Sequence, residues 1–232
     1  MKACFLFALL LPHQASFAQY EQAKPDVLVI IADQWSPRYT GWDNPEVRTP
    51  HMDRIAAEGM IFDACYVTSP VCMPARLSLL TGLYPHNSGH SLWGNANGFC
   101  VEVAEAAMYR DIQRAGLTTA HVGKTHWTSG PAWQQQFKNS GAFLNQIRLD
   151  HVVDISGPPD STRGRDPYVQ HLKQRGLLDA VAEDMHGRYL SGEFEPRPSK
   201  APVEDYHDVF TTGRAVDFIR QQPREKPFCL VV

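Results

Sequence analysis

The feature that most constrains the fold is a short apolar run, VLVIIA, at residues 27–32. Pro25 precedes this run, Asp33 follows it, and four of its six side chains are β-branched. A near-continuous apolar stretch of this length is typical of a strand buried on both faces, as the strands of parallel sheets are. The run therefore predicts an internal strand of an α/β domain.

Helical and extended patterns alternate after this strand. Thr49 is a good N-cap for a helix over residues 50–58, Gly59 supplies its end, and residues 61–67 are expected to be extended. The alternation continues beyond the first hundred residues, and the expected elements are a helix over 101–115, a strand over 117–124, a helix within 203–222 and a strand beginning at Pro227. This order predicts an α/β fold with a largely parallel sheet flanked by helices.

Residues 128–200 contain Pro-, Gly- and Ser-rich stretches, namely GPAW, SGPPDSTRGRDP and SGEFEPRPSK. Such composition favours long surface loops over regular structure. The chain stops at Val232, soon after its last expected strand begins. We therefore expect an α/β domain that is truncated at its C-terminus.

The first 18 residues have the pattern of a signal peptide. Lys2 precedes an apolar core over residues 3–11, and small residues before and at Ala18 offer a cleavage site. The core is too short to span a bilayer, although an N-terminal anchor is the alternative. We expect a periplasmic or secreted protein with no membrane attachment after cleavage. The net charge of −3 and the lack of a basic run give no reason to expect nucleic acid as a partner.

The five cysteines are spaced neither as a compact disulfide framework nor as the paired CxxC of a zinc site. Cys65 and Cys229 lie in apolar runs and are expected to be buried. His51, His86 and His90 do not share one helical face, so surface or loop positions are expected for them rather than a zinc site.

Cys72 stands apart because of its neighbours in SPVCMPARLSLLTG, residues 69–82. At the start of a helix it would lie near unpaired backbone N–H groups and the positive end of the helix dipole, a setting that binds anions. Arg76 lies one turn further on and can share that face. The alternative, a buried cysteine beside an exposed arginine, stays open on spacing alone.

Polar side chains also follow two expected strands. Asp33, with Gln34, offers hard oxygen ligands for Ca²⁺ or Mg²⁺ at a strand end, where open α/β sheets place their ligand sites. Lys124 and His126 are two residues apart, so an extended backbone directs both to one side. A cation and an imidazole there suit an anion with a leaving group to protonate. Solvated turn residues are the alternative for each.

Three segments resemble the type I sulfatases of the alkaline phosphatase superfamily. They are DVLVIIADQ, TPHMDRIAAEGMIFDACYVTSPVCMPARLSLLTGLYPHNSGH and HVGKTHW. The resemblance runs from about residue 25 to residue 127, and more weakly through 203–232. It implies an alkaline-phosphatase-like fold in which residues 25–232 are the N-terminal part of a sulfatase catalytic domain.

The resemblance implies a particular chemistry for Cys72. A formylglycine-generating enzyme would read C-x-P-x-R and convert this cysteine to an aldehyde, which hydrates. One hydroxyl attacks sulfur and releases the alcohol, and the second expels sulfate by breaking the carbon–oxygen bond, which restores the aldehyde. Arg76 would stabilise the diol, and Lys124 and His126 would contact sulfate oxygens.

The resemblance also implies a calcium site, with magnesium as the other candidate ion, held by Asp33, Gln34 and the modified Cys72. These supply fewer than the six to eight oxygens that calcium takes, so low or no activity is expected of 232 residues. Trp35 and Trp127 could line the cleft and stack on a sugar or aryl ring, or pack in the core.

The implied function is an exported hydrolase of sulfate esters, carried by a small molecule or a glycan. Two further functions stay open. One is a phosphonate monoester or phosphodiester hydrolase using the same formylglycine; Gln34 resembles a branch of the superfamily that includes choline-sulfatase-like and phosphonate-hydrolase-like proteins. The other is a catalytically dead remnant that binds sulfated glycans. A misfolded gene fragment is the remaining alternative.

Overall fold

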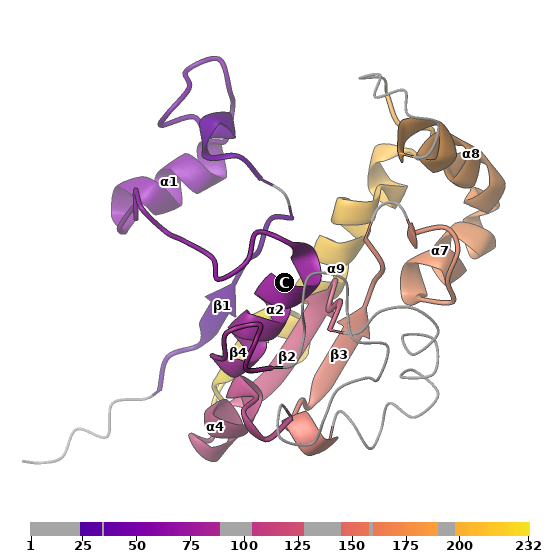
Figure 1. The fold of residues 1–232 in the computed structure, drawn as a ribbon. Helices are drawn as coiled ribbons and strands as arrows, with labels where there is room; N and C mark the ends of the chain where they lie inside the picture. The colour runs from indigo at the N-terminus through magenta and orange to yellow at the C-terminus, as the bar shows by residue number, and fades with distance from the viewer. Residues whose placement is uncertain (1–23, 34, 89–103, 128–144, 158–159, 190–197) are drawn as a thin grey trace, which may run out of the picture.

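The structure, a computed structural model, describes residues 24–33, 35–88, 104–127, 145–157, 160–189 and 198–232. Within these residues it contains a four-stranded sheet with helices on both faces (Figure 1). The strands are β1 Val27–Val29, β2 Thr118–Gly123, β3 His151–Asp154 and β4 Phe228–Val231. They lie in the order β1-β4-β2-β3, and each pair is parallel. The predicted α/β fold with a parallel sheet is confirmed.

The two middle strands have the burial expected of a parallel sheet, but β1 does not. All four residues of β4 are buried, as are the last five of β2. In β1, Val27 and Leu28 are exposed because this strand lies at the edge of the described sheet and pairs with β4 on one side. The expectation that the run at 27–32 is buried on both faces is therefore wrong for the part of the chain described here.

Helices α2 (Cys72–Thr81) and α4 (Met108–Arg114) cover one face of the sheet, and α9 (His207–Gln221) covers the other. The α2 side buries an apolar cluster that includes Leu77, Leu80 and Tyr109. On the α9 side, Phe218 packs against residues of β2 and β4. The helix expected over 101–115 is interrupted, because Ala107 has extended dihedral angles and α4 begins after it. The helix expected within 203–222 is present as a short 3-10 turn, η3 (Val203–Asp205), followed by α9.

Besides β3, two helices lie within residues 128–200, where the sequence predicted loops. They are α7 (Pro167–Arg175) and α8 (Leu178–Tyr189), which pack together over a third apolar cluster beyond β3. Asp166 caps α7 by accepting the Val169 N–H at 2.9 Å, and Gly176 ends the helix with φ 68°. The Asp-Pro pair that ends SGPPDSTRGRDP therefore starts a helix, although the sequence suggested a loop there.

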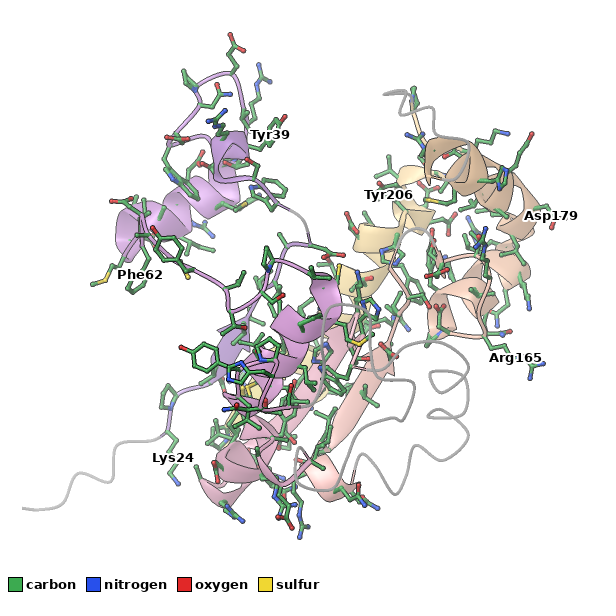
Figure 2. The ribbon with its side chains drawn as sticks, viewed as in Figure 1. Lys24, Tyr39, Phe62, Arg165, Asp179 and Tyr206 are labelled. Carbon is green, nitrogen blue, oxygen red and sulfur yellow. The ribbon has the colours of Figure 1, made fainter. Side chains whose placement is uncertain are left out.

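The segment from Trp35 to Val67 extends away from the sheet (Figure 1), and we call it the arm. It contains a 3-10 turn, η1 (Pro37–Tyr39), and α1 (Pro50–Glu58), none of whose residues is buried. Residues 61–67 form no strand, and Cys65 is exposed, so both predictions for this region are wrong. Within the described residues, no element covers the apolar run around Cys65, and Figure 2 shows Phe62 at the outer side of the arm.

Candidate active site

The carboxyl ends of the parallel strands bring the predicted residues of two strands to one edge of the sheet. Asp33 follows β1, Lys124 follows β2 directly, and α2 begins at Cys72 over the same face. The chain positions of Asp33 and Lys124 differ by 91 residues, yet the Lys124 Nζ donates a hydrogen bond to the Asp33 Oδ2 at 2.7 Å. This convergence is what the parallel topology requires of residues at the ends of nearby strands.

Arg76 joins the same cluster from α2. Its Nη2 lies 3.6 Å from the Asp33 Oδ1, and its Nη1 donates to the Lys124 carbonyl oxygen. Partial burial acts to raise the pKa of Asp33, but the hydrogen bond and charge of Lys124 and the charge of Arg76 outweigh burial and lower it. Asp33 is therefore ionised at neutral pH, and two cations converge on one carboxylate.

Cys72 is the first residue of α2 and is exposed. The apolar side of α2 faces the core, where Met73, Pro74, Leu77 and Leu80 are buried. Arg76 follows Cys72 by one helical turn, and residues at that spacing are neighbours on a helix surface. The alternative of a buried cysteine beside an exposed arginine is therefore wrong. Cys72 is exposed, and the Arg76 guanidinium contacts Asp33.

His126 follows Lys124 on the same segment and has φ 46°, which is uncommon for a residue other than glycine. Its Nδ1 is buried and has no hydrogen-bond partner among the described residues. Burial lowers the pKa of His126, and the nearby charges of Lys124 and Arg76 lower it further. The imidazole is therefore neutral at pH 7, with a ring nitrogen left for a ligand to contact.

Beneath this cluster lies a buried polar pair that sequence reasoning missed. The Tyr109 hydroxyl and the His121 Nδ1 are 2.9 Å apart inside the core, and Trp127 packs edge-on against the His121 ring. Burial lowers the pKa of His121 to about 4, and the Arg76 charge adds to the effect. The sequence did carry a signal for this burial: side chains alternate along β2, so His121 lies on the same face of the sheet as Thr119.

The remaining predicted residues are divided between core, surface and the undescribed part of the chain. Trp127 is 4% exposed and Trp35 is 47% exposed, so the first belongs to the core and the second does not. His51 and His86 are exposed, as expected. The predictions for Gln34, His90 and the signal peptide over residues 1–18 lie outside the described residues.

The donor set for a hard cation is partial. Asp33 supplies a carboxylate, the ligand type that calcium and magnesium prefer. Among the residues that the structure describes, no three His, Cys, Asp or Glu side chains come together in a way that could hold a metal ion. Asp33 alone does not make such a site, and Lys124 takes one of its oxygens.

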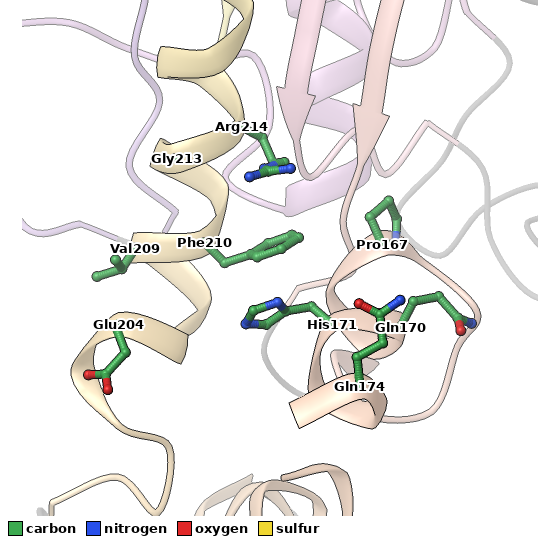
Figure 3. Close-up of a pocket in the computed structure, with 9 residues that line it drawn as sticks. All are labelled: Pro167, Gln170, His171, Gln174, Glu204, Val209, Phe210, Gly213 and Arg214. Atoms are coloured by element: carbon green, nitrogen blue, oxygen red, sulfur yellow. The ribbon is translucent and has the colours of Figure 1, made fainter. Parts of the chain in front are cut away.

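A separate pocket of about 530 Å³ lies between α7 and α9 (Figure 3). His171, Phe210 and Arg214 point into it from the two helices. Two of its ionic side chains already have partners: His171 contacts Asp205 at 2.7 Å, and Arg214 contacts Asp217 at 2.8 Å. This pocket includes none of the residues predicted for the site.

A sequence model of the sulfatase family matches residues 25–232. The chain belongs to the sulfatase family. Among curated relatives of this sulfatase, an N-acetylgalactosamine-6-O-sulfatase of Bacteroides thetaiotaomicron is 36% identical over 200 residues, which cover 82% of this chain and 39% of the relative. An N-acetylglucosamine-6-O-sulfatase of the same organism is 26% identical and matches 97% of this chain, but 33% of its own length.

Solved structures agree on the fold of this sulfatase. A phosphonate monoester hydrolase from Silicibacter pomeroyi superposes with a TM-score of 0.62 at 22% identity, covering 90% of this chain and 40% of the hydrolase. A sulfatase from Pseudoalteromonas sp. gives a TM-score of 0.56 at 23% identity, covering 90% and 43% respectively. The chain thus spans between a third and about two-fifths of these relatives. None of the described helices has the length and apolar character needed to cross a membrane.

Proposed function

We propose that this sulfatase hydrolyses sulfate esters of a saccharide, through a formylglycine made from Cys72. The observation that carries the proposal is the convergence of Arg76 and Lys124 on Asp33 beside a helix that begins with an exposed Cys72. Two relatives named for 6-O-sulfated amino sugars support the substrate class. A fold relative solved in complex with D-glucosamine-2-N,6-O-disulfate is compatible with it.

Each residue of the cluster has a proposed task. A hydrated formylglycine at position 72 supplies a hydroxyl nucleophile toward sulfur, and the C-x-P-x-R segment around it is what a formylglycine-generating enzyme would read. Lys124 and Arg76 carry positive charge toward the sulfate oxygens, where negative charge increases in the transition state. The neutral His126 hydrogen-bonds to the substrate through its Nδ1, which has no partner among the described residues.

Asp33 and Gln34 are the proposed protein ligands of a calcium ion, with position 72 as a third. Bound calcium would supply a Lewis acid that polarises an oxygen of the substrate or nucleophile. The described residues do not complete its coordination, so the remaining ligands are proposed to lie outside them.

The domain assignment and localisation are also proposals. Residues 1–18 act as an export signal, residues 25–232 form the N-terminal part of the catalytic domain, and the mature protein is periplasmic or secreted. Fractionation of the source cells, with N-terminal sequencing of the mature protein, tests the export signal and the localisation. A mature chain that retains residues 1–18 in the cytoplasm would contradict them.

The central experiment examines the modification and the reaction together. Protein purified from its own host is digested, and the peptide containing Cys72 is analysed by mass spectrometry for an aldehyde in place of the thiol. Release of sulfate from a 6-O-sulfated amino sugar is measured beside cleavage of an aryl phosphonate monoester, the reaction of the alternative hydrolase. We expect the aldehyde and preferential sulfate release.

Two variants sharpen this experiment. Cys72→Ala should abolish sulfate release, and Cys65→Ala, which changes an exposed cysteine on the arm, should leave it unchanged. Faster cleavage of the phosphonate would favour the alternative hydrolase. Saturable binding of the sulfated sugar with no release, insensitive to Cys72→Ala, would favour a binding remnant. An unmodified thiol with undiminished release in Cys72→Ala would refute the formylglycine mechanism.

A further inference from the structure

The residues at the end of β3 lie against the segment that carries Lys124 and His126. The Asp154 Oδ1 accepts the Thr125 N–H at 3.0 Å, and the Ile155 N–H donates to the Gly123 carbonyl at 3.0 Å. The same peptide unit is held from its other side, because the Lys124 carbonyl accepts from Arg76. Both polar atoms of the peptide between Lys124 and Thr125 are thus bonded to side chains that can carry charge.

Gly157 contacts the other part of this segment, the side chain of Lys124. A Cβ placed on Gly157 would lie 3.1 Å from the Lys124 Nζ, 3.2 Å from its Cε and 3.3 Å from its Cδ. The φ of Gly157 is not in the left-handed region, unlike that of Gly123, so the backbone does not itself call for glycine. What the missing side chain provides is space, which lets Lys124 lie across Gly157 and reach Asp33.

Two helices hold this short segment in place. The Ser156 N–H donates to the Asp166 Oδ2 at 3.0 Å, and the Ser156 carbonyl lies 2.8 Å from the His207 Nε2. Asp166 is the N-cap of α7, and His207 is the first residue of α9. The segment from Asp154 to Gly157 is therefore fixed between the helices on one side and the Lys124 segment on the other.

We propose that Asp154 and Gly157 are positioning residues that set the direction of Lys124 and His126 toward the bound sulfate group. Asp154 fixes the peptide that joins Lys124 to Thr125, and His126 follows it with its uncommon φ. Gly157 leaves the space in which the Lys124 ammonium reaches the cluster. The proposal rests on the proposed function for its ligand, but its geometry can be tested without one.

The first test concerns Gly157. Gly157→Ala should push the Lys124 side chain aside by a few tenths of an ångström, and the Lys124 amine should then be acetylated several-fold faster by an N-hydroxysuccinimide ester. Peptide mass spectrometry measures the rate at Lys124. Gly213→Ala is the matched control, because a Cβ there meets nothing within 4 Å. Equal rates in the wild type and Gly157→Ala would overturn the role of Gly157.

The second test concerns Asp154. Asp154→Ala should speed hydrogen exchange of the Thr125 amide about tenfold or more, whereas Asp154→Asn keeps an oxygen acceptor and should stay near the wild-type rate. Exchange is followed by NMR on the full chain, with unfolding midpoints recorded for each variant. A uniform increase over the whole sheet in both variants, or no increase in Asp154→Ala, would overturn the role of Asp154.

The third measurement separates this proposal from the proposed function. Inorganic sulfate is titrated into the wild type, Gly157→Ala and Gly213→Ala with calcium present. Displacing the Lys124 ammonium weakens its charged hydrogen bond to sulfate, so sulfate affinity should fall several-fold in Gly157→Ala. Altered acetylation and exchange without sulfate binding by any variant would support the positioning role and refute the proposed ligand. Sulfate binding that is equal in wild type and Gly157→Ala would support the ligand and refute the positioning role.

Discussion

Replacing Asp154 by asparagine removes a buried charge while keeping an oxygen that can accept the Thr125 N–H. Burial raises the pKa of Asp154 from 3.8 to about 6, and the nearby Asp166 carboxylate adds to the effect. The Thr125 N–H opposes the rise without cancelling it. The folded wild type therefore binds a proton more tightly than the unfolded chain does.

The direction of the pH effect follows from this difference. Below pH 3.8 the side chain is protonated in both states, and its pKa contributes nothing to the free energy of unfolding. As the pH rises from 3.8 to about 6, the unfolded chain gives up this proton while the folded side chain keeps it, and the wild type loses about 3 kcal/mol of stability. Asp154→Asn has no such loss, so its free energy of unfolding minus that of the wild type should increase by about 3 kcal/mol from pH 3.5 to pH 7.

The pH dependence of the wild type measured by itself would not reveal the Asp154 contribution, because His121 opposes it. Its pKa is lowered by burial from 6.5 to about 4, so the folded state binds a proton less tightly than the unfolded chain. Its contribution is fully present above pH 6.5 and is lost as the pH falls toward 4, with a magnitude of about 3 kcal/mol. Between pH 4 and 6 the two side chains act in opposite directions, so the difference between variants is the quantity to measure.

Equilibrium urea unfolding, followed by tryptophan fluorescence at half-unit pH steps from 3.5 to 7.5, gives the required free energies. Titrating groups distant from Asp154 are common to both proteins and cancel in the difference. Gly213→Ala, which alters no titratable group, should differ from the wild type by a constant. Parallel curves for Asp154→Asn and the wild type would refute the reasoning, because they would mean that the ionised carboxylate is no worse stabilised in the fold than in water.

Three further changes test the site and its support. Cys72→Ala should reduce sulfate ester hydrolysis below detection and Cys72→Ser nearly so, measured by sulfate release; wild-type rates in either would contradict the proposed nucleophile. Asp33→Asn should weaken calcium binding, measured by isothermal titration, and excess calcium should partly restore turnover; unchanged affinity would contradict its role as a ligand. Tyr109→Phe removes the partner of the buried His121 Nδ1 and should cost about 1–3 kcal/mol in urea unfolding, whereas Tyr84→Phe, at an exposed tyrosine, should cost little; equal effects would contradict the importance of the buried pair.

Sequence patterns were sufficient for the sheet direction and for part of the site. The alternation of strands and helices predicted parallel strands, and parallel strands place their carboxyl ends at one edge. That rule predicts that Asp33 and Lys124 lie close together although 91 residues separate them in the sequence. With Cys72 at the start of an expected helix, the four-residue spacing predicted that Arg76 lies on the same helix face.

Other features depend on partners that no local pattern reveals. The sequence around α7 and α8 is rich in residues that either break or cap helices, and the choice is made by packing onto the third apolar cluster. His121 and Asp154 are polar residues of β-strands. Each is buried with a hydrogen bond to a residue elsewhere in the chain, His121 to Tyr109 and Asp154 to Thr125. The apolar run at Val27 predicts burial, but burial also requires a covering element.

The arm has a consequence for how the molecule opens. Its large apolar side chains include Phe62 and Tyr66, which are 72% and 90% exposed, and no residue of α1 is buried. A region held by so few interior contacts has a small free energy of local opening, set by its own helix and turns and not by the sheet. We therefore expect the arm to open locally more easily than the sheet does, and Cys72 lies just beyond the arm, at the start of α2.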